Sequence, residues 1–387
     1  MTNRGRPIRV LYLIDSLGSG GAQRQLVTLA TSLARSAVEP EVALYHPVRH
    51  FAPDLCAAGV RIHQLGVRGG KDPGVFLSLA RLVRTRRFDI VHTYLTRPGV
   101  LARLAMLGRS SPRVVVSERS VDLGHYPLMV AAERLLSRRG AAMVVNADVV
   151  REYIEEIVPA WRGRVRVIPN GIAWAEPTPE EEEAAAAWRA SLIGDARLLL
   201  AVVARVSREK NPLLLLAAVS RLPERARKAI RFVWVGACRD RAFGQQVAEE
   251  VSARGLTERV LFLPPTEAIR DVYLGADAVG LTSDWEGFPN ALLEATAHGR
   301  PAIATSVGCV TDLVRPGENG WLISPGDAAS LTEALEQLAD TPAERLREMG
   351  RNGSERVLQE YSADRLASRT LRLYREILDS QRGPATS

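Results

Sequence analysis

Short apolar runs rich in β-branched residues recur along the whole chain, separated by longer segments with helical periodicity. Within a run the apolar residues are continuous rather than alternating, as at 8–14 and 198–203, and this is typical of parallel strands buried on both faces. Parallel strands need crossover connections, which the intervening helical segments supply. The first series predicts strands at 8–14, 41–45, 61–64, 89–93, 113–117, 142–146 and 165–168, and the second at 198–203, 232–236, 260–263, 278–282, 302–304 and 321–323.

The two series predict two α/β domains, each a doubly wound parallel sheet. A chain of 387 residues is also too long for one ordinary core. The join lies where Pro177 and Pro179 precede the acidic run 180–183. We therefore expect an N-terminal domain at residues 1–170 and a C-terminal domain at 171–361, with a last helix at about 362–382 that packs back on the first domain.

Composition is that of a globular protein, with 46% hydrophobic and 25% charged residues. The longest apolar runs fall well short of the roughly 20 residues that a membrane span needs. The polar start of the chain, 1–6, shows no signal peptide. Three cysteines, Cys56, Cys238 and Cys309, are few and far apart, which favours reduced thiols. We expect a cytoplasmic protein.

Positive charge is concentrated in the first half. Residues 1–170 hold 25 Lys+Arg against 13 Asp+Glu, a net charge of +12, whereas the rest hold 26 against 31, a net charge of −5. Basic residues stand beside apolar ones at 75–88, 97–109 and 128–139. These segments are either surfaces that rest on anionic lipid at the inner membrane face or the solvated faces of core-packing helices. No nucleic-acid partner is expected, because no recognised reader motif accompanies the charge.

A glycine-rich loop follows the first predicted strand. Gly18, Gly20 and Gly21 permit close approach of the backbone to an anion, as phosphate-binding loops require; a tight turn without a ligand is the alternative. The spacing is not G-x-G-x-x-G, and the second strand ends at 45–47 without an acidic residue to hold a ribose. A nicotinamide dehydrogenase is therefore disfavoured.

Two cations follow the first strand of the second half. Arg205 and Lys210 stand at the carboxyl end of a parallel strand, where open α/β sheets bind ligands. A leaving diphosphate needs such positive charge when no metal is present. Lys210 is one of three lysines among 51 Lys+Arg, which favours a function for it over a solvated loop charge.

Glu286 and Glu294 flank a predicted helix start in the segment 287–290. Pro289 suits the first helical position, because its missing N–H would be unpaired there. Free N–H groups near 290–292 would attract a phosphate, while the carboxylates accept hydrogen bonds from hydroxyl groups. Two glutamates at this spacing are common on helices. The pattern gains its weight from the helix start between them and from the cationic loop upstream.

The three motifs, in this order and spacing, resemble those of the retaining nucleotide-sugar glycosyltransferases of family 4, glycosyl transferases group 1. Gly20-Gly21 is similar to the family's glycine loop, Arg205 with Lys210 to its diphosphate-binding pair, and Glu286 with Glu294 to its E-x7-E motif. Segments 168–172 and 305–314 resemble its interdomain junction and the region after the glutamates. The resemblance covers most of the chain and implies GT-B architecture, two Rossmann-like doubly wound parallel-sheet domains facing each other across a cleft.

The resemblance also implies roles for individual residues. Glu286, Arg205 and Lys210 would be catalytic, with Glu286 on the donor-sugar hydroxyls, and Glu294 would hold the ribose. The first domain would bind the acceptor and the second the nucleotide sugar. The implied donor-binding residues are Gly20, Gly21, Arg205, Lys210, Gly287, Phe288, Pro289, Asn290, Ala291, Leu292 and Glu294.

The acceptor side departs from the family pattern. Many relatives carry a histidine after a strand of the first domain, but here the strand at 113–117 leads to Glu118 and Arg119. One of these residues would take its place, or His125 or His92 would; a structural role for His125 is the alternative. No metal site is expected, because there is no D-x-D motif and the histidines do not cluster at ligand spacings.

The resemblance therefore implies a hexosyltransferase-type enzyme that moves a sugar from a nucleotide diphosphate to a lipid-linked or saccharide acceptor with retention and without a metal. No cofactor is expected, because the nucleotide sugar is a co-substrate. Two alternatives stay open at this point. One is a non-catalytic GT-B subunit that binds nucleotide sugar, and the other is a GT-B nucleotide-sugar epimerase.

Overall fold

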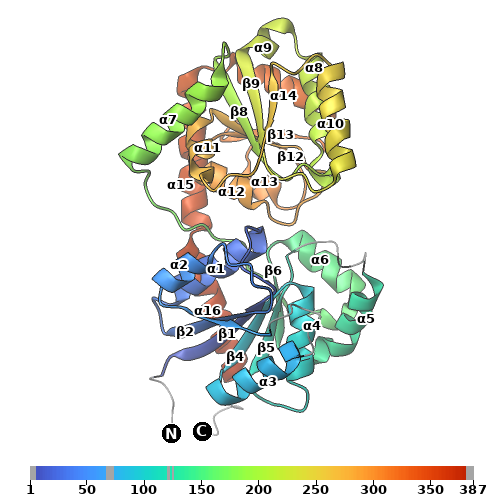
Figure 1. Ribbon diagram of the computed structural model, residues 1–387, viewed down its shortest axis with the longest axis vertical. Helices are drawn as coiled ribbons and strands as arrows, with labels where there is room; N and C mark the ends of the chain where they lie inside the picture. The colour runs from blue at the N-terminus through green and yellow to red at the C-terminus, as the bar shows by residue number, and fades with distance from the viewer. Residues whose placement is uncertain (1–5, 67–73, 120–122, 124–125, 381–387) are drawn as a thin grey trace. The chain divides into compact units, whose positions relative to one another are not determined.

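The computed structural model describes residues 6–66, 74–119, 123 and 126–380 and divides into two compact units (Figure 1). The first unit is Met1–Ala173 with Tyr361–Ser387, and the second is Trp174–Glu360. Each unit is an α/β fold around a parallel sheet of its own. The assignment of acceptor to one unit and nucleotide sugar to the other stays a prediction.

The first unit has a seven-stranded sheet of order β3-β2-β1-β4-β5-β6-β7, the doubly wound order. Its strands are β1 (Ile8–Ile14), β2 (Val38–Leu44), β3 (Arg61–Gln64), β4 (Ile90–Tyr94), β5 (Arg113–Ser117), β6 (Ala142–Val145) and β7 (Val165–Val167). Its helices are α1 (Gly21–Leu33), α2 (Ala52–Ala57), α3 (Gly74–Arg86), α4 (Thr96–Ala105), α5 (Pro127–Leu136), α6 (Asp148–Ile157) and α16 (Ala363–Asp379), with 3-10 turns η2 (Ser137–Arg139) and η3 (Pro159–Trp161).

Helices cover both faces of this sheet (Figure 1). Alternate residues of β1, Val10, Tyr12 and Ile14, are fully buried and form one core with residues of α1 and α16. The last helix, drawn in red at the lower unit, therefore completes the core of the chain's first strands (Figure 1). The residues between Val10 and Ile14 are buried as well, because a doubly wound sheet has no solvated face.

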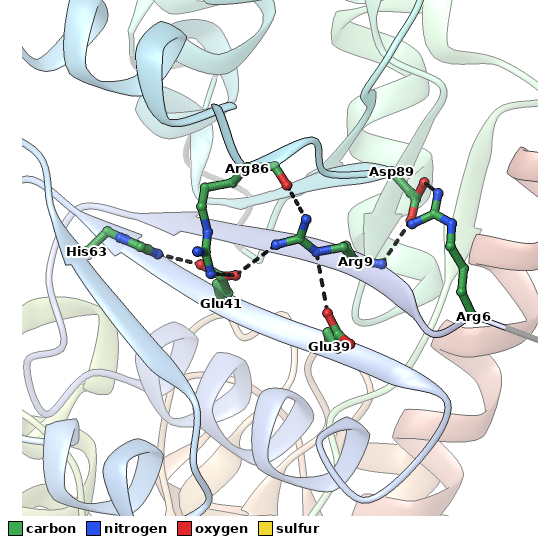
Figure 2. A network of polar contacts seen from close by, with 7 residues as sticks. All are labelled: Arg6, Arg9, Glu39, Glu41, His63, Arg86 and Asp89. Carbon is green, nitrogen blue, oxygen red and sulfur yellow. Dashed lines mark hydrogen bonds and ion pairs between the residues drawn. The ribbon is translucent and has the colours of Figure 1, made fainter. Parts of the chain in front are cut away.

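A network of charged side chains joins the amino ends of the first unit's strands (Figure 2). Asp89 accepts hydrogen bonds from the Arg6 guanidinium at 2.6 Å and from the Arg9 backbone N–H at 2.9 Å. Glu41 on β2 contacts Arg86 at 2.6 Å and His63 at 2.5 Å. Burial alone would raise the pKa of Glu41, but the hydrogen bonds from Arg86 and His63 outweigh it, so its pKa lies below the usual value. The carboxylate is therefore buried in paired, charged form.

The second unit has a six-stranded sheet of order β10-β9-β8-β11-β12-β13. Its strands are β8 (Leu198–Val203), β9 (Ile230–Val235), β10 (Val260–Leu263), β11 (Ala278–Leu281), β12 (Ala302–Thr305) and β13 (Gly320–Ile323). Its helices are α7 (Pro179–Ile193), α8 (Pro212–Arg221), α9 (Glu224–Ala229), α10 (Arg241–Ala253), α11 (Ile269–Gly275), α12 (Asn290–Ala297), α13 (Val310–Leu313), α14 (Ala328–Asp340) and α15 (Ala343–Glu360), with the 3-10 turn η4 (Arg208–Lys210).

Strand order in the second unit repeats the doubly wound pattern, with β8 at its centre. Residues 199 to 201 of β8 are at most 1% exposed, and helices pack on both faces of the strand. The unit begins with α7, where Thr178 and Glu181 form a reciprocal capping box. Arg270 then pairs with Glu181 at 2.8 Å, which fixes α7 against α11.

The strands expected from the apolar runs are all present, and both sheets are parallel, so the predicted fold class is confirmed. The largest boundary difference is in β2, which begins at Val38 rather than at Glu41. β3 pairs with β2 only from Glu41 onward, so Pro40 lies where one side of β2 has no neighbour. No helix in the described part of the chain is long and apolar enough to cross a membrane.

Candidate active site

The switch point of the second sheet lies between β8 and β11, where the chain leaves neighbouring parallel strands in opposite directions. Open α/β sheets bind ligands at the carboxyl ends of such strands. The segment after β8 carries Arg205 and Lys210, and the segment after β11 carries Glu286. Two of the predicted motifs therefore occupy the two loops of one switch point.

Lys210 and Glu286 form an ion pair across this switch point. Lys210 Nζ lies 2.5 Å from Glu286 Oε1, and the Ser283 hydroxyl donates to the same oxygen at 2.7 Å. The two charged side chains are only 18% and 10% exposed, so solvent screens the pair weakly. Glu286 Oε2 has no hydrogen-bond partner among the described residues, which leaves that oxygen for a hydroxyl group.

Backbone contacts hold the two loops in register. The Thr282 hydroxyl donates to the Lys210 carbonyl at 2.8 Å, and the Asp284 N–H donates to the Glu209 carbonyl at 2.9 Å. Asn211 caps α8 through the Leu214 N–H. Its amide also donates to Asp284 at 2.8 Å. The Lys210–Glu286 contact is thus built into the loop framework, which favours a preorganised site.

Arg205 is placed differently from Lys210. Its side chain is 54% exposed and pairs with Glu209 at 2.8 Å, four residues along the chain. An exposed pair of this kind contributes little to stability, and it leaves the guanidinium able to move to an anionic ligand. The predicted pair of cations therefore consists of one fixed side chain and one exposed one.

The helix between the two glutamates is α12. It begins at Asn290, with Pro289 at the N-cap position, so the expectation that Pro289 is the first helical residue is wrong by one position. Pro289 has extended backbone, ψ 99, and the helix starts only where helical angles begin. The helix ends at Ala297, and Gly299 follows with φ +70; the N–H groups of Gly299 and Arg300 donate to carbonyls of the last turn.

Two of the predicted donor-binding residues around the start of α12 are buried. Phe288 is 7% exposed and Leu292 is 3% exposed, so their side chains pack in the unit's interior. The start of α12 has leading N–H groups without an acceptor inside the helix, and these groups can serve an anion. The contribution of Gly287, Pro289, Asn290 and Ala291 to donor binding stays a prediction.

Glu294 lies within α12 and is oriented by α11. The Tyr273 hydroxyl donates to Glu294 Oε2 at 3.1 Å. His298 follows one turn later, with Nδ1 2.7 Å from the Glu294 carbonyl and its ring 5.4 Å from that of Tyr273. Burial lowers the pKa of His298, which favours the neutral ring. Tyr273 and His298 therefore fix the turn that presents Glu294.

Gly308 shapes the backbone next to Glu286. It has φ +56, and a Cβ at this position would clash with the Glu286 carbonyl oxygen. Only glycine adopts this conformation without strain and allows so close an approach. The segment after β12 thus packs directly against the loop that carries Glu286, and it lies in the region that the sequence comparison singled out at 305–314.

In the first unit the glycine loop precedes α1, with Gly20 at its N-cap. Gly20 has φ −81, so its backbone does not require glycine. A Cβ at Gly20 would instead clash with the end of the Gln23 side chain, whose amide lies 3.3 Å from Asp15. Gly20 and Gly21 are exposed at the carboxyl end of β1, and their role with a donor stays a prediction.

His92 on β4 is buried, with 1% exposure. Its Nδ1 lies 2.6 Å from the Tyr374 hydroxyl on α16, and its Nε2 lies 2.7 Å from the Ser117 hydroxyl. Burial, and then the charge of Arg119, lower the pKa of His92 to about 3. The ring is therefore neutral and fully engaged in the interior, and a residue so placed acts on a ligand only through its neighbours.

Glu118 and Arg119 follow directly after β5. Glu118 is 3% exposed and accepts a hydrogen bond from Thr96 at 2.5 Å. Arg119 is half-buried over the Tyr94 ring and donates to the Asn170 side chain at 2.8 Å. Arg119 thus holds the segment 168–172 within the first unit. His125 lies outside the described residues.

No cluster of three or more His, Cys, Asp or Glu side chains in the described part of the chain is arranged to hold a metal ion. The two switch-point loops and α12 together supply two cations, two carboxylates and a helix start. Such a set binds hydroxyl groups and a polyanion and offers positive charge to an oxygen that becomes negative.

Two family models match the chain, glycosyl transferases group 1 over residues 186–356 and glycosyl transferase 4-like domain over residues 20–171. The chain is 30% identical over 362 residues to a D-inositol 3-phosphate glycosyltransferase of Nocardia farcinica, covering 86% of this chain and 79% of that protein. The chain belongs to glycosyltransferase family 4. Members of this family are retaining enzymes that use nucleotide sugars, and the expected transferase class is confirmed.

Other members of family 4 and solved GT-B structures are also similar. An alpha-maltose-1-phosphate synthase of Mycolicibacterium smegmatis is 28% identical over 317 residues, covering 74% of this chain and 79% of that protein. The structure of Anabaena Alr3699/HepE in complex with UDP and glucose has a TM-score of 0.79 at 18% identity, covering 95% of this chain and 99% of that one. Sucrose-phosphate synthase from Thermosynechococcus elongatus has a TM-score of 0.79 at 19% identity over 96% and 100%. These likenesses establish the GT-B fold.

Three residues near the motifs were not found from the sequence. Ser283 and Tyr273 each hold a motif glutamate, and Gln25 exchanges two hydrogen bonds with the Gly171 backbone at 2.9 and 2.8 Å. Ser283 stands three residues before Glu286, which could have marked it. Tyr273 and Gln25 gave no signal, because their partners are distant in the sequence.

Proposed function

We propose that this family 4 enzyme transfers a hexosyl group from a nucleotide diphosphate sugar to a lipid-linked or saccharide acceptor, with retention of anomeric configuration and without a metal ion. The observation that carries the proposal is the Lys210–Glu286–Ser283 cluster at the switch point of the second sheet. It brings together a fixed carboxylate and a fixed cation, which the donor sugar and its leaving diphosphate require.

Glu286 is proposed to accept hydrogen bonds from donor-sugar hydroxyls. Its Oε1 is occupied by Lys210 and Ser283, so Oε2 would face the sugar. A carboxylate held on one side by two donors keeps its orientation when the ligand arrives, which lowers the entropic cost of binding. Glu294, oriented by Tyr273, is proposed to hold the ribose hydroxyls.

The leaving diphosphate is proposed to bind Lys210, Arg205 and the start of α12. The negative charge on the departing oxygen grows in the transition state, so positive groups near it accelerate the reaction more than they strengthen ground-state binding. Arg205 would leave Glu209 to reach the phosphates. Loss of one such stabilising group typically lowers kcat by about 10²–10³.

The acceptor is proposed to bind the first unit. Its sequence carries most of the chain's positive charge, which fits an acceptor with a phosphate group or one presented at an anionic membrane surface of the cytoplasm. The names of the relatives, D-inositol 3-phosphate glycosyltransferase and alpha-maltose-1-phosphate synthase, agree with a phosphorylated acceptor. Glu118 and Arg119 are the proposed acceptor-side residues that the structure describes near a strand's carboxyl end.

The test is transfer by purified protein across a panel of nucleotide sugars. Lipid-linked saccharides, free oligosaccharides and D-inositol 3-phosphate would serve as acceptors, and the anomeric form of the product would be determined. Glu286→Gln should abolish transfer while donor binding persists in weakened form. Glu333→Gln, an exposed position on α14, removes the same charge and should leave turnover unchanged. Full activity of Glu286→Gln would refute the proposed role, and sugar epimerisation without acceptor would favour an epimerase.

A further inference from the structure

A cavity of about 70 Å³ lies at the amino ends of β5 and β6 in the first unit. One bound water needs roughly 10–15 Å³ of such volume, so there is room for a group of several non-hydrogen atoms. Five arginines contribute to the lining, and the described lining residues include no aspartate or glutamate. These arginines are Arg103, Arg109, Arg113, Arg138 and Arg139.

Among the residues that the structure describes, one of the five arginines has an ion-pair partner. Arg103 is fully buried and makes a two-pronged ion pair with Glu133. The other four have no ion pair with any residue that the structure describes. The Nε of Arg113 is buried and has no hydrogen-bond partner among the described residues. A buried hydrogen-bond donor without a partner costs free energy, so a ligand with an acceptor atom in the cavity would stabilise this donor.

A further arginine adds to the positive charge beside the cavity. Arg164 donates to the backbone carbonyls of Ser137 and Gly140, which bracket the turn η2 that carries Arg138. Burial lowers the pKa of Arg164, and the charge of Arg138 lowers it further. Two like charges held this close repel each other, and a bound anion would relieve that repulsion.

We propose that this cavity is a binding site for a phosphate group. Guanidinium groups present paired N–H donors that match phosphate oxygens, and Arg109, Arg113, Arg138 and Arg139 would surround the ligand from the segment after α4, the start of β5 and η2. Nucleotide and acceptor sites of doubly wound folds lie at the carboxyl ends of the strands. This cavity lies at their amino ends, so the site is independent of the proposed transfer reaction.

The first test is binding of inorganic phosphate, measured by calorimetry at low salt. The double variant Arg138→Gln/Arg139→Gln should weaken binding at the cavity by at least about tenfold, because it removes two charge-assisted interactions. The control is Arg81→Gln/Arg84→Gln on α3, where two exposed arginines are removed with the same change of charge. Equal losses in both variants would mean that phosphate responds only to net charge, and the proposal would be wrong.

The second test locates the bound phosphate. Phenylglyoxal modifies accessible arginines, and mass spectrometry of the peptides shows which ones phosphate protects. Protection should appear at Arg109, Arg138 and Arg139 and be absent at Arg81 and Arg84. Phosphate that binds near Lys210 in the second unit would protect Arg205 only, and that pattern alone would contradict the proposal. A thermal melt of each variant checks that the first unit stays folded.

The source of the phosphate group is distinguished with vesicles. Phosphatidylcholine vesicles with and without phosphatidic acid present the same monoester on a surface. If the protein binds only the vesicles with phosphatidic acid and the Arg138/Arg139 variant loses this, the ligand is a lipid headgroup. If it ignores vesicles while phosphate still protects the cavity arginines, the ligand is a soluble phosphate compound. If the protein ignores both kinds of vesicle and phosphate protects none of the cavity arginines, the proposed site is wrong.

Discussion

The Lys210–Glu286 ion pair offers a test that separates the two charges from their neighbours. Lys210→Met removes the cation and keeps the length of the side chain. Glu286, 10% exposed, would then keep only the Ser283 hydroxyl as a partner on Oε1. A charge-assisted hydrogen bond contributes about 1.5–3 kcal/mol, and an unpaired charge of low exposure costs a similar amount. Allowing for partial solvent access, we expect Lys210→Met to lower the stability of the second unit by about 1–2 kcal/mol.

The double-mutant cycle with Glu286→Gln measures the pair itself. The two single variants and the double variant would be compared by calorimetry, where about 1–2 kcal/mol corresponds to a shift of roughly 2–8 °C in Tm for a unit of this size. Because Glu286→Gln removes the stranded charge, the double variant should be more stable than the sum of the single effects predicts, with a coupling energy of about 1–2 kcal/mol. Effects that simply add would refute the ion pair as a stabilising contact of the unliganded enzyme.

Three further changes have defined outcomes. Glu133→Gln should lower stability by about 3–5 kcal/mol in urea unfolding, since it leaves the buried Arg103 charge unpaired; a loss below about 1 kcal/mol would contradict this. Tyr273→Phe, which removes the donor to Glu294, should weaken nucleoside diphosphate binding by about fivefold in calorimetry while Tm barely changes, and unchanged affinity would count against it. His92 has a pKa of about 3 in the folded state and roughly 6.5 when unfolded. Its contribution to stability is therefore complete above about pH 6.5 and is lost as pH falls toward 3. His92→Gln should flatten the pH dependence of the unfolding free energy between pH 6.5 and 4, and an unchanged slope would refute the low pKa of His92.

Strand positions followed from the sequence because continuous apolar runs have one physical cause, burial on both faces of a parallel sheet. β1 and β8 were found with the bounds that the structure has. The start of helix α12 was predicted from its proline and was misplaced by one residue, because Pro289 serves as N-cap. The positions of strands and helices can thus be predicted from the local sequence.

Contacts between side chains that are far apart in the sequence could not be predicted in the same way. The resemblance placed Arg205 and Lys210 together as cations for a diphosphate, but the structure holds Lys210 against Glu286, 76 residues later, and leaves Arg205 exposed. His92 was one of four candidates for the acceptor side, yet it is buried and hydrogen-bonded to Tyr374, which lies 282 residues later in the chain. Such pairings depend on the order of strands in the sheet, which no single segment encodes.

The account rests on the claim that the switch-point loops of the second unit bind a nucleotide sugar. A crystal structure with a non-transferable nucleotide sugar would test it directly. We predict the diphosphate within hydrogen-bond distance of Lys210 and the first N–H groups of α12, sugar hydroxyls on Glu286 and ribose hydroxyls on Glu294. A donor bound away from these residues, or bound with Glu286 and Glu294 both facing solvent, would contradict the account.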